Sequence, residues 1–154
     1  MKDQLFNAIR EGDVSVVSQL LLKDASLVNE KDARGSTPLL LATYYGSVEI
    51  AKTLLQCPQN IDAQDASGNT ALMGVCFKGF ENIAELLVDS GANVNVTNFN
   101  GSTALIFAAT FAKENIVKML LDKGADISLK DDRGNSALDH AKMQGNKTII
   151  NLLS

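Results

Sequence analysis

The sequence predicts an all-α solenoid, a stack of helix-turn-helix units joined by β-turn or hairpin loops. Glycines recur at a step of 33 residues, and a hydroxyl residue, a leucine and an isoleucine follow each of them at fixed distances. A period of about 20–50 residues indicates repeated structural units rather than one irregular domain. The recurring residues are Gly35, Gly68, Gly101 and Gly134; Thr37, Thr70, Thr103 and Ser136; Leu39, Leu72, Leu105 and Leu138; and Ile50, Ile83, Ile116 and Ile149.

Each unit begins with a tight turn and a first helix. The turn at residues 32–35 has Asp at its first position and Gly at its fourth, a pattern that type I turns favour. Thr37 then suits a helix N-cap, and Pro38 suits the first helical position, where its missing N–H breaks no helical hydrogen bond. The helix runs for about eight residues and should end near Gly46, a residue suited to the left-handed conformation that closes many helices.

A second short helix completes each unit. Ile50, Leu54 and Leu55 give it one apolar stripe. Gly91 and Gly124 are expected to end the equivalent helices of the next two units. Helices of this length are marginal on their own, so their apolar stripes must be buried against neighbouring units.

The 154 residues suit one domain or one short stack of repeats. We expect a single domain over 1–154, divided into an N-terminal cap, three internal units and a C-terminal cap. In the last unit, polar residues alternate with the apolar residues of its final helix, as expected of a cap with one polar face. The units are 1–31, 32–64, 65–97, 98–130 and 131–154.

Two positions depart from the repeat. Pro58 stands where Gly91 and Gly124 stand, and proline cannot adopt a left-handed conformation, so the second unit should turn differently. Ala112 replaces the helix-ending glycine that the other units carry, for example Gly46. If the backbone there is left-handed, alanine costs on the order of 1 kcal/mol.

Several segments resemble the ankyrin repeat family, whose units repeat every 33 residues around a Thr-Pro-Leu-His-x-Ala core. The resemblance spans essentially the whole chain, although the signature His is replaced by Leu40, Met73, Ile106 and Asp139. The segments that carry it are TPLLLA at 37–42, SGNTALMGV at 67–75, NGSTALIFAA at 100–109, GANVN at 91–95 and GADIS at 124–128.

The resemblance implies a non-catalytic protein–protein interaction module. It would bind a protein or an extended peptide on its concave groove, with a regulatory or inhibitory role as one concrete version. The alternative is a scaffold, or a detached domain of a larger multi-domain protein. Such folds carry many unrelated functions, so the partner does not follow from the fold.

Composition and charge argue against some classes of partner and indicate the cellular location that we expect. The formal charge of −4 and the lack of a basic stripe argue against nucleic acid and membrane surfaces as partners. No apolar run approaches the roughly 18–20 residues of a spanning helix, and the start lacks the apolar run of a signal peptide. We expect a cytoplasmic monomer, with signal-less export left open.

No catalytic, metal or cofactor site is expected. His140, the only histidine, falls at the position of Leu41, Gly74 and Phe107 in other units. It should lie roughly 20 Å from Cys76, too far for a Cys–His pair. Cys76 should be a small buried thiol, and Cys57, in a loop beside Pro58, is a candidate exposed thiol. One His and two dispersed Cys cannot form a zinc site. The recurrent aspartates Asp32, Asp65 and Asp131 are assigned to turns rather than to acid–base catalysis.

The resemblance also assigns candidate partner-binding residues, since turn tips and first-helix ends line the groove in this family. Five of the eight aromatic residues fall on these positions, and interfaces favour such residues. We expect the five rings to form one connected patch about 20 Å long. The alternative is that some of them fill gaps between units as core. The candidates are Arg34, Tyr44, Tyr45, Phe77, Lys78, Phe99, Asn100, Phe111, Arg133 and Met143.

Overall fold

The computed structural model describes all residues, 1–154, and all of its secondary structure elements are helices. Ten α-helices form five successive pairs, and a short 3-10 helix, η1 (Ala25–Asn29), follows the first pair. None of the helices is both long enough and apolar enough to cross a membrane. The helices are α1 (Lys2–Glu11), α2 (Val14–Lys23), α3 (Pro38–Tyr44), α4 (Val48–Leu55), α5 (Ala71–Lys78), α6 (Glu81–Asp89), α7 (Ala104–Thr110), α8 (Glu114–Asp122), α9 (Ala137–Gln144) and α10 (Lys147–Leu153).

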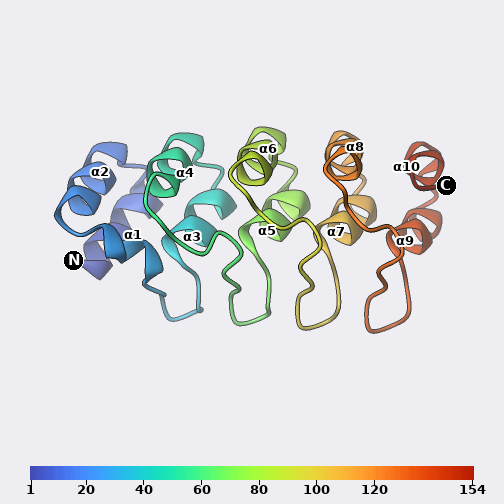
Figure 1. Cartoon of the computed structure of the whole chain (residues 1–154), viewed down its shortest axis with the longest axis horizontal. Helices are drawn as coiled ribbons and strands as arrows, with labels where there is room; N and C mark the ends of the chain where they lie inside the picture. The colour runs from blue at the N-terminus through green and yellow to red at the C-terminus, as the bar shows by residue number, and fades with distance from the viewer.

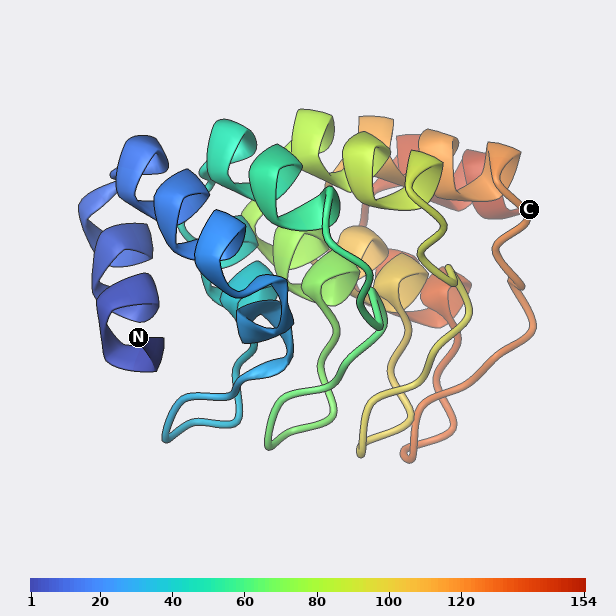
Figure 2. The same ribbon diagram turned by 60° about the vertical axis from the view of Figure 1, so that its left-hand side comes forward.

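The pairs stand side by side in a row, with the two termini at opposite ends (Figure 1). The first helices of the pairs form one layer, in which α3, α5, α7 and α9 each contact the first helix before them. The second helices, from α2 to α10, form the other layer. Four long loops extend from the first-helix layer and run alongside one another (Figure 2). The predicted all-α solenoid is therefore confirmed.

The repeated apolar positions form the core. Ile50, Ile83, Ile116 and Ile149 are all buried, as are Leu54, Leu87, Leu120 and Leu153. Leu39, Leu72 and Leu105 are buried as well, whereas Leu138 in the last unit is only partly buried. One hydrophobic cluster runs from α3 to α10, and a second joins α1 and α2 to α3 and α4. The stack is thus held together by side chains that each unit buries against its neighbours.

The first helices start at the predicted hydroxyl residues. The side-chain oxygens of Thr37, Thr70, Thr103 and Ser136 each accept the backbone N–H three residues later, at 3.2–3.3 Å. In the last unit the Asp139 carboxylate also accepts the Ser136 N–H at 2.9 Å, which completes a capping box. Asp139, at the position of the signature His, therefore forms a local side-chain hydrogen bond that Leu40, Met73 and Ile106 cannot form.

The aspartates at the start of the turns accept hydrogen bonds from the backbone of their own turn, as predicted. One carboxylate oxygen of Asp32 accepts the N–H groups of Arg34 and Ser36, each at 2.9 Å. Asp65 and Asp131 make the same pair of hydrogen bonds, and Asn98 makes them with its amide oxygen in the fourth unit. These side chains shape the turns, which accounts for their recurrence.

Pro58 changes the turn after α4, as predicted. In the third unit the N–H of Ala92 donates to the carbonyl of Leu87 at 3.0 Å and closes the helix. The second unit has no such backbone bond; there the side-chain amide of Gln59 donates to the carbonyl of Leu54 at 2.6 Å. A side chain thus replaces the backbone donor that the glycine-containing turn supplies.

Ala112 is left-handed, with a φ of 59°, and is the one residue other than glycine with a positive φ. Alanine is strained in this conformation and glycine is not. We expect Ala112→Gly to raise the free energy of unfolding by about 1 kcal/mol, measured by denaturant titration. As a control, Ala66→Gly, at an exposed turn position with a negative φ, should be neutral or destabilising. Loss of stability in Ala112→Gly would contradict the strain.

Candidate protein-binding groove

Exposed apolar side chains gather at the carboxyl ends of the first helices. Tyr44, Tyr45, Phe77, Phe111 and Met143 are between 42% and 60% exposed. Three of the aromatic residues outside these positions differ, since Phe6 is buried and Phe80 and Phe107 are partly buried, whereas Phe99, in a turn, is exposed. The rings at the helix ends are therefore not core residues, although the same short helices bury their other apolar side chains.

Four of these rings, from three consecutive units, form two contacting pairs. The Phe77 and Phe111 rings meet edge to face, with centroids 4.7 Å apart and planes at 87°. Tyr44 and Tyr45 have centroids 6.2 Å apart. The Lys78 ammonium lies 4.4 Å from the centre of the Tyr44 ring, a cation–π contact that links the second unit to the third. We call Tyr44, Tyr45, Phe77 and Phe111 the ring cluster.

Phe99 does not join the ring cluster, which corrects the expectation of one patch of five rings. Its N–H donates to the carbonyl of Ser67 at 3.2 Å, so its turn is bonded back onto the preceding turn. The ring then lies against Gly68, where an added methyl carbon would be only 2.7 Å away. Phe99 borders a separate hollow beside Asp62 and Gln64 and remains 66% exposed.

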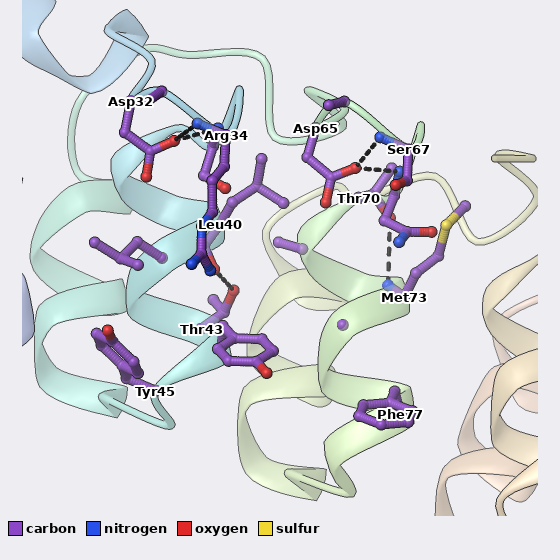
Figure 3. Close-up of a pocket in the computed structure, with 18 of the residues that line it drawn as sticks. Asp32, Arg34, Leu40, Thr43, Tyr45, Asp65, Ser67, Thr70, Met73 and Phe77 are labelled. Atoms are coloured by element: carbon purple, nitrogen blue, oxygen red, sulfur yellow. Dashed lines mark hydrogen bonds between the residues drawn. The ribbon is translucent and has the colours of Figure 1, made fainter. Parts of the chain in front are cut away.

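A hollow of about 870 Å³ opens between α3 and α5, next to the ring cluster. Its turn side carries Asp32, Arg34, Asp65 and Ser67, and its helix-end side carries Tyr45 and Phe77 (Figure 3). Apolar side chains form much of the remaining lining. These are Leu40, Leu41, Met73 and Phe107.

Charged groups of both signs line this hollow. Asp32 and Asp65 lie on the turn side, where one oxygen of each already accepts two backbone N–H groups. Arg10 and Arg34 line the hollow, and neither they nor Lys78 form a salt bridge. No buried side-chain nitrogen or oxygen in the chain lacks a hydrogen-bond partner. Arg10 also donates to the side-chain oxygen of Asn7 at 3.1 Å. The groups left to bind a partner are therefore the exposed rings, the cations and the second carboxylate oxygens of Asp32 and Asp65.

Comparison with known proteins decides the family. A family model described as "Ankyrin repeats (3 copies)" matches residues 5–98, more than half of the chain. The chain belongs to the ankyrin repeat family. A second model, "Ankyrin repeats (many copies)", matches residues 86–141. Ankyrin repeats are generally protein–protein interaction modules and are typically non-catalytic.

A relative supports the assignment over a shorter stretch. Ankyrin repeat domain-containing protein 49 of Drosophila melanogaster is 45% identical over 53 residues. The match covers 34% of this chain and 25% of the relative. This chain is thus similar to a quarter of that protein's length, and the likeness assigns no partner.

The remaining candidate residues lie toward the C-terminal end of the ankyrin array. Asn100 and Arg133 are exposed at the tips of the last two turns. The carbonyl of Asn100 accepts the N–H of Asp132 at 3.0 Å, which ties these two turns together. Met143 is exposed at the end of α9. The structure thus divides the candidates between a central group around the hollow and a C-terminal group beyond it.

His140 has a partner that the sequence reasoning missed. Its Nε2 lies 2.7 Å from the Asp131 carboxylate, so the ring joins α9 to the turn of its own unit. Burial disfavours the charged carboxylate, but hydrogen bonds from the Asn135 N–H, the His140 ring and the Arg133 N–H outweigh it and lower the pKa of Asp131. The one signal for this pair in the sequence was the recurrent turn aspartate, which precedes the helix position that His140 occupies.

The cysteines are separate and unequal in burial. Cys76 is fully buried, as expected, and burial raises the pKa of its thiol. Cys57, a candidate exposed thiol, is instead half-buried against the cluster around α1 to α4. No three His, Cys, Asp or Glu side chains lie close enough together to hold a metal ion.

Proposed function

We propose that this chain is a non-catalytic binding module that holds another protein, or an extended peptide, on the concave groove. The observation that carries the proposal is the ring cluster, in which exposed rings from three consecutive units form two contacting pairs, with Lys78 of the third unit over Tyr44 of the second. Contiguous exposed apolar surface usually marks an interaction site. Tyr, Phe, Met and Arg are also the residues that interfaces favour.

The proposed site comprises the ring cluster, the cations beside it and the C-terminal candidates. A regulatory or inhibitory action on the bound protein is one version of this role. The chain would act as a monomer in the cytoplasm, and its formal charge of −4 opposes binding to nucleic acid or to anionic membranes. The site residues are Arg34, Tyr44, Tyr45, Phe77, Lys78, Asn100, Phe111, Arg133 and Met143, with Phe99 on the neighbouring face.

The alternative is a scaffold, or one domain of a larger multi-domain protein. In this role too the groove would hold a partner, but the biological activity would reside in the attached domains.

Removing ring pairs from the groove tests the proposal. We expect Tyr45→Ala/Phe77→Ala and Phe77→Ala/Phe111→Ala to lose a partner captured from the source cells and identified by mass spectrometry. Truncation of one true anchor costs about 2 kcal/mol or more, roughly a thirtyfold loss of affinity. The melting temperatures of both variants should change little, because these side chains are not core.

A buried ring provides the control. Phe6→Ala removes a core side chain from α1 and should lower the melting temperature while leaving the groove in place. If the groove variants unfold as readily as Phe6→Ala, the rings are packing between units. If they stay folded and keep the partner, binding takes place on another face.

A further inference from the structure

Gly74 lies in the interior of α5, where the equivalent positions of the other units hold Leu41, Phe107 and His140. Its φ is not in the left-handed region, and a methyl carbon added there would meet nothing within 4 Å. Neither the backbone nor the packing requires glycine at this position. Glycine is nonetheless less favourable than alanine inside a helix, so the fold alone gives it no reason to be there.

The absence of a side chain opens the groove at this point. Gly74 lines the hollow between α3 and α5, and so do Leu41 and Phe107 from the units on either side. A row of side chains along successive first helices is therefore interrupted at its centre. The space between Leu41 and Phe107, with Met73 and Phe77 beside it, is called here the Gly74 slot.

The surroundings of the slot indicate the charge of its occupant. Arg34 extends from the turn side (Figure 3). Arg10 lines the same hollow, and Lys78 lies beside it over the Tyr44 ring. Asp32 and Asp65 line the same hollow, but none of the three cations forms a salt bridge with them. Arg10 donates to Asn7 at 3.1 Å, whereas the Arg34 guanidinium has no hydrogen-bond partner within the chain. Guanidinium and ammonium groups only donate hydrogen bonds, so they are best matched by carboxylates of a partner.

We propose that the Gly74 slot receives one large apolar side chain, aromatic or leucine, of a protein segment in which acidic residues flank that anchor. The proposal rests on the proposed function of the groove and adds the chemistry of what it binds. The hollow of about 870 Å³ exceeds the volume of one side chain, so it accommodates the anchor together with its neighbours. Apolar anchors in such pockets carry most of the affinity of an interface.

The test uses a phage-displayed library of random 12-residue peptides selected on the whole chain. The recovered peptides should share one Phe, Tyr, Trp or Leu next to Asp or Glu. Synthetic copies should bind Gly74→Leu at least about tenfold more weakly than the unchanged chain, because leucine fills the slot. Replacing the peptide acids by Gln, or Arg34 by Ala, should weaken binding and reduce its dependence on salt.

The melting temperature provides a second readout, since a side chain at Gly74 should stabilise the helix while it blocks the slot. Gly74→Ala should raise the melting temperature by roughly 2–4 °C, since alanine favours the helix and meets no atom. Gly74→Leu should stay folded while it loses the peptides. Asn82→Leu, which adds the same side chain at an exposed position on α6, should leave peptide binding unchanged.

The outcomes separate the slot from the groove as a whole. If Tyr45→Ala/Phe77→Ala loses the peptides and Gly74→Leu keeps them, the groove binds but the slot does not. If both variants keep them, the groove is not the binding site and the proposed function fails as well. A selection that yields no binder, or peptides without acidic residues, also overturns the proposed occupant.

Discussion

Replacing Leu87 by alanine should lower the free energy of unfolding by about 2–5 kcal/mol, the range typical of fully buried leucines. Leu87 lies on α6 in the central unit and is 0% exposed. Because α6 contacts α4 and α8 as well as α5, two neighbouring units pack against this helix and cannot easily collapse into the cavity. The loss should be measured by denaturant unfolding.

Leu153→Ala supplies the matched control, since it removes the same side chain at the equivalent position of the last unit. Leu153 is 4% exposed and lies on α10, which contacts α8 and α9, so a neighbouring unit packs against it on one side. In a solenoid, stability is approximately a sum over units and their interfaces. We therefore expect a smaller loss for Leu153→Ala. If Leu153→Ala loses as much unfolding free energy as Leu87→Ala, or more, the last unit does not behave as an edge of the stack.

Features set within one unit could be predicted from the sequence. The turn aspartates, the threonine caps and the left-handed Ala112 depend on residues a few positions apart, and local backbone geometry fixes them. The changed turn at Pro58 followed in the same way, although the donor that replaces the lost bond, the Gln59 side chain, did not. Local chemistry therefore predicts these elements well.

Features that depend on how separate elements pack together, within a unit or between units, could not be predicted. The pairing of His140 with Asp131 requires the distance between a helix and its turn. Phe99 was placed on the groove by its position in the repeat, yet a bond to Ser67 holds its ring against Gly68 instead. The 33-residue period identifies equivalent positions, but it does not say which side chains meet across a unit boundary.

The contacts between turns show the same limit. The second of the four turns is bonded to the third through Ser67 and Phe99, and the third to the fourth through Asn100 and Asp132. No equivalent backbone bond joins the first turn, at 32–36, to the second, and the hollow lies beside this pair. All four turns keep the glycine and three keep the leading aspartate, so the period alone gives no warning of the difference.

Two glycines separate backbone strain from close packing between turns. Gly68 and Gly134 occupy the same position of their turns, have the same φ of 81°, and donate the same hydrogen bond, to Asp65 and Asp131, at 2.9 Å. They differ in what lies next to them. A methyl carbon at Gly68 would be 2.7 Å from the backbone nitrogen of Phe99, whereas at Gly134 nothing lies within 4 Å.

We expect Gly134→Ala to cost about 1–2 kcal/mol of unfolding free energy, the penalty of a left-handed alanine. Gly68→Ala should cost about 1–3 kcal/mol more, because the methyl group collides with a backbone atom and forces the turns apart. The difference between the two, measured in the same denaturant titration, is the contribution of the close approach. Because the bond from Phe99 to Ser67 should break with it, Gly68→Ala should also expose the amide of Phe99 to faster hydrogen exchange. If both variants lose the same amount and the Phe99 amide stays protected, the turn glycine serves the backbone alone, and the packing of one turn on the next adds nothing to the stability of the stack.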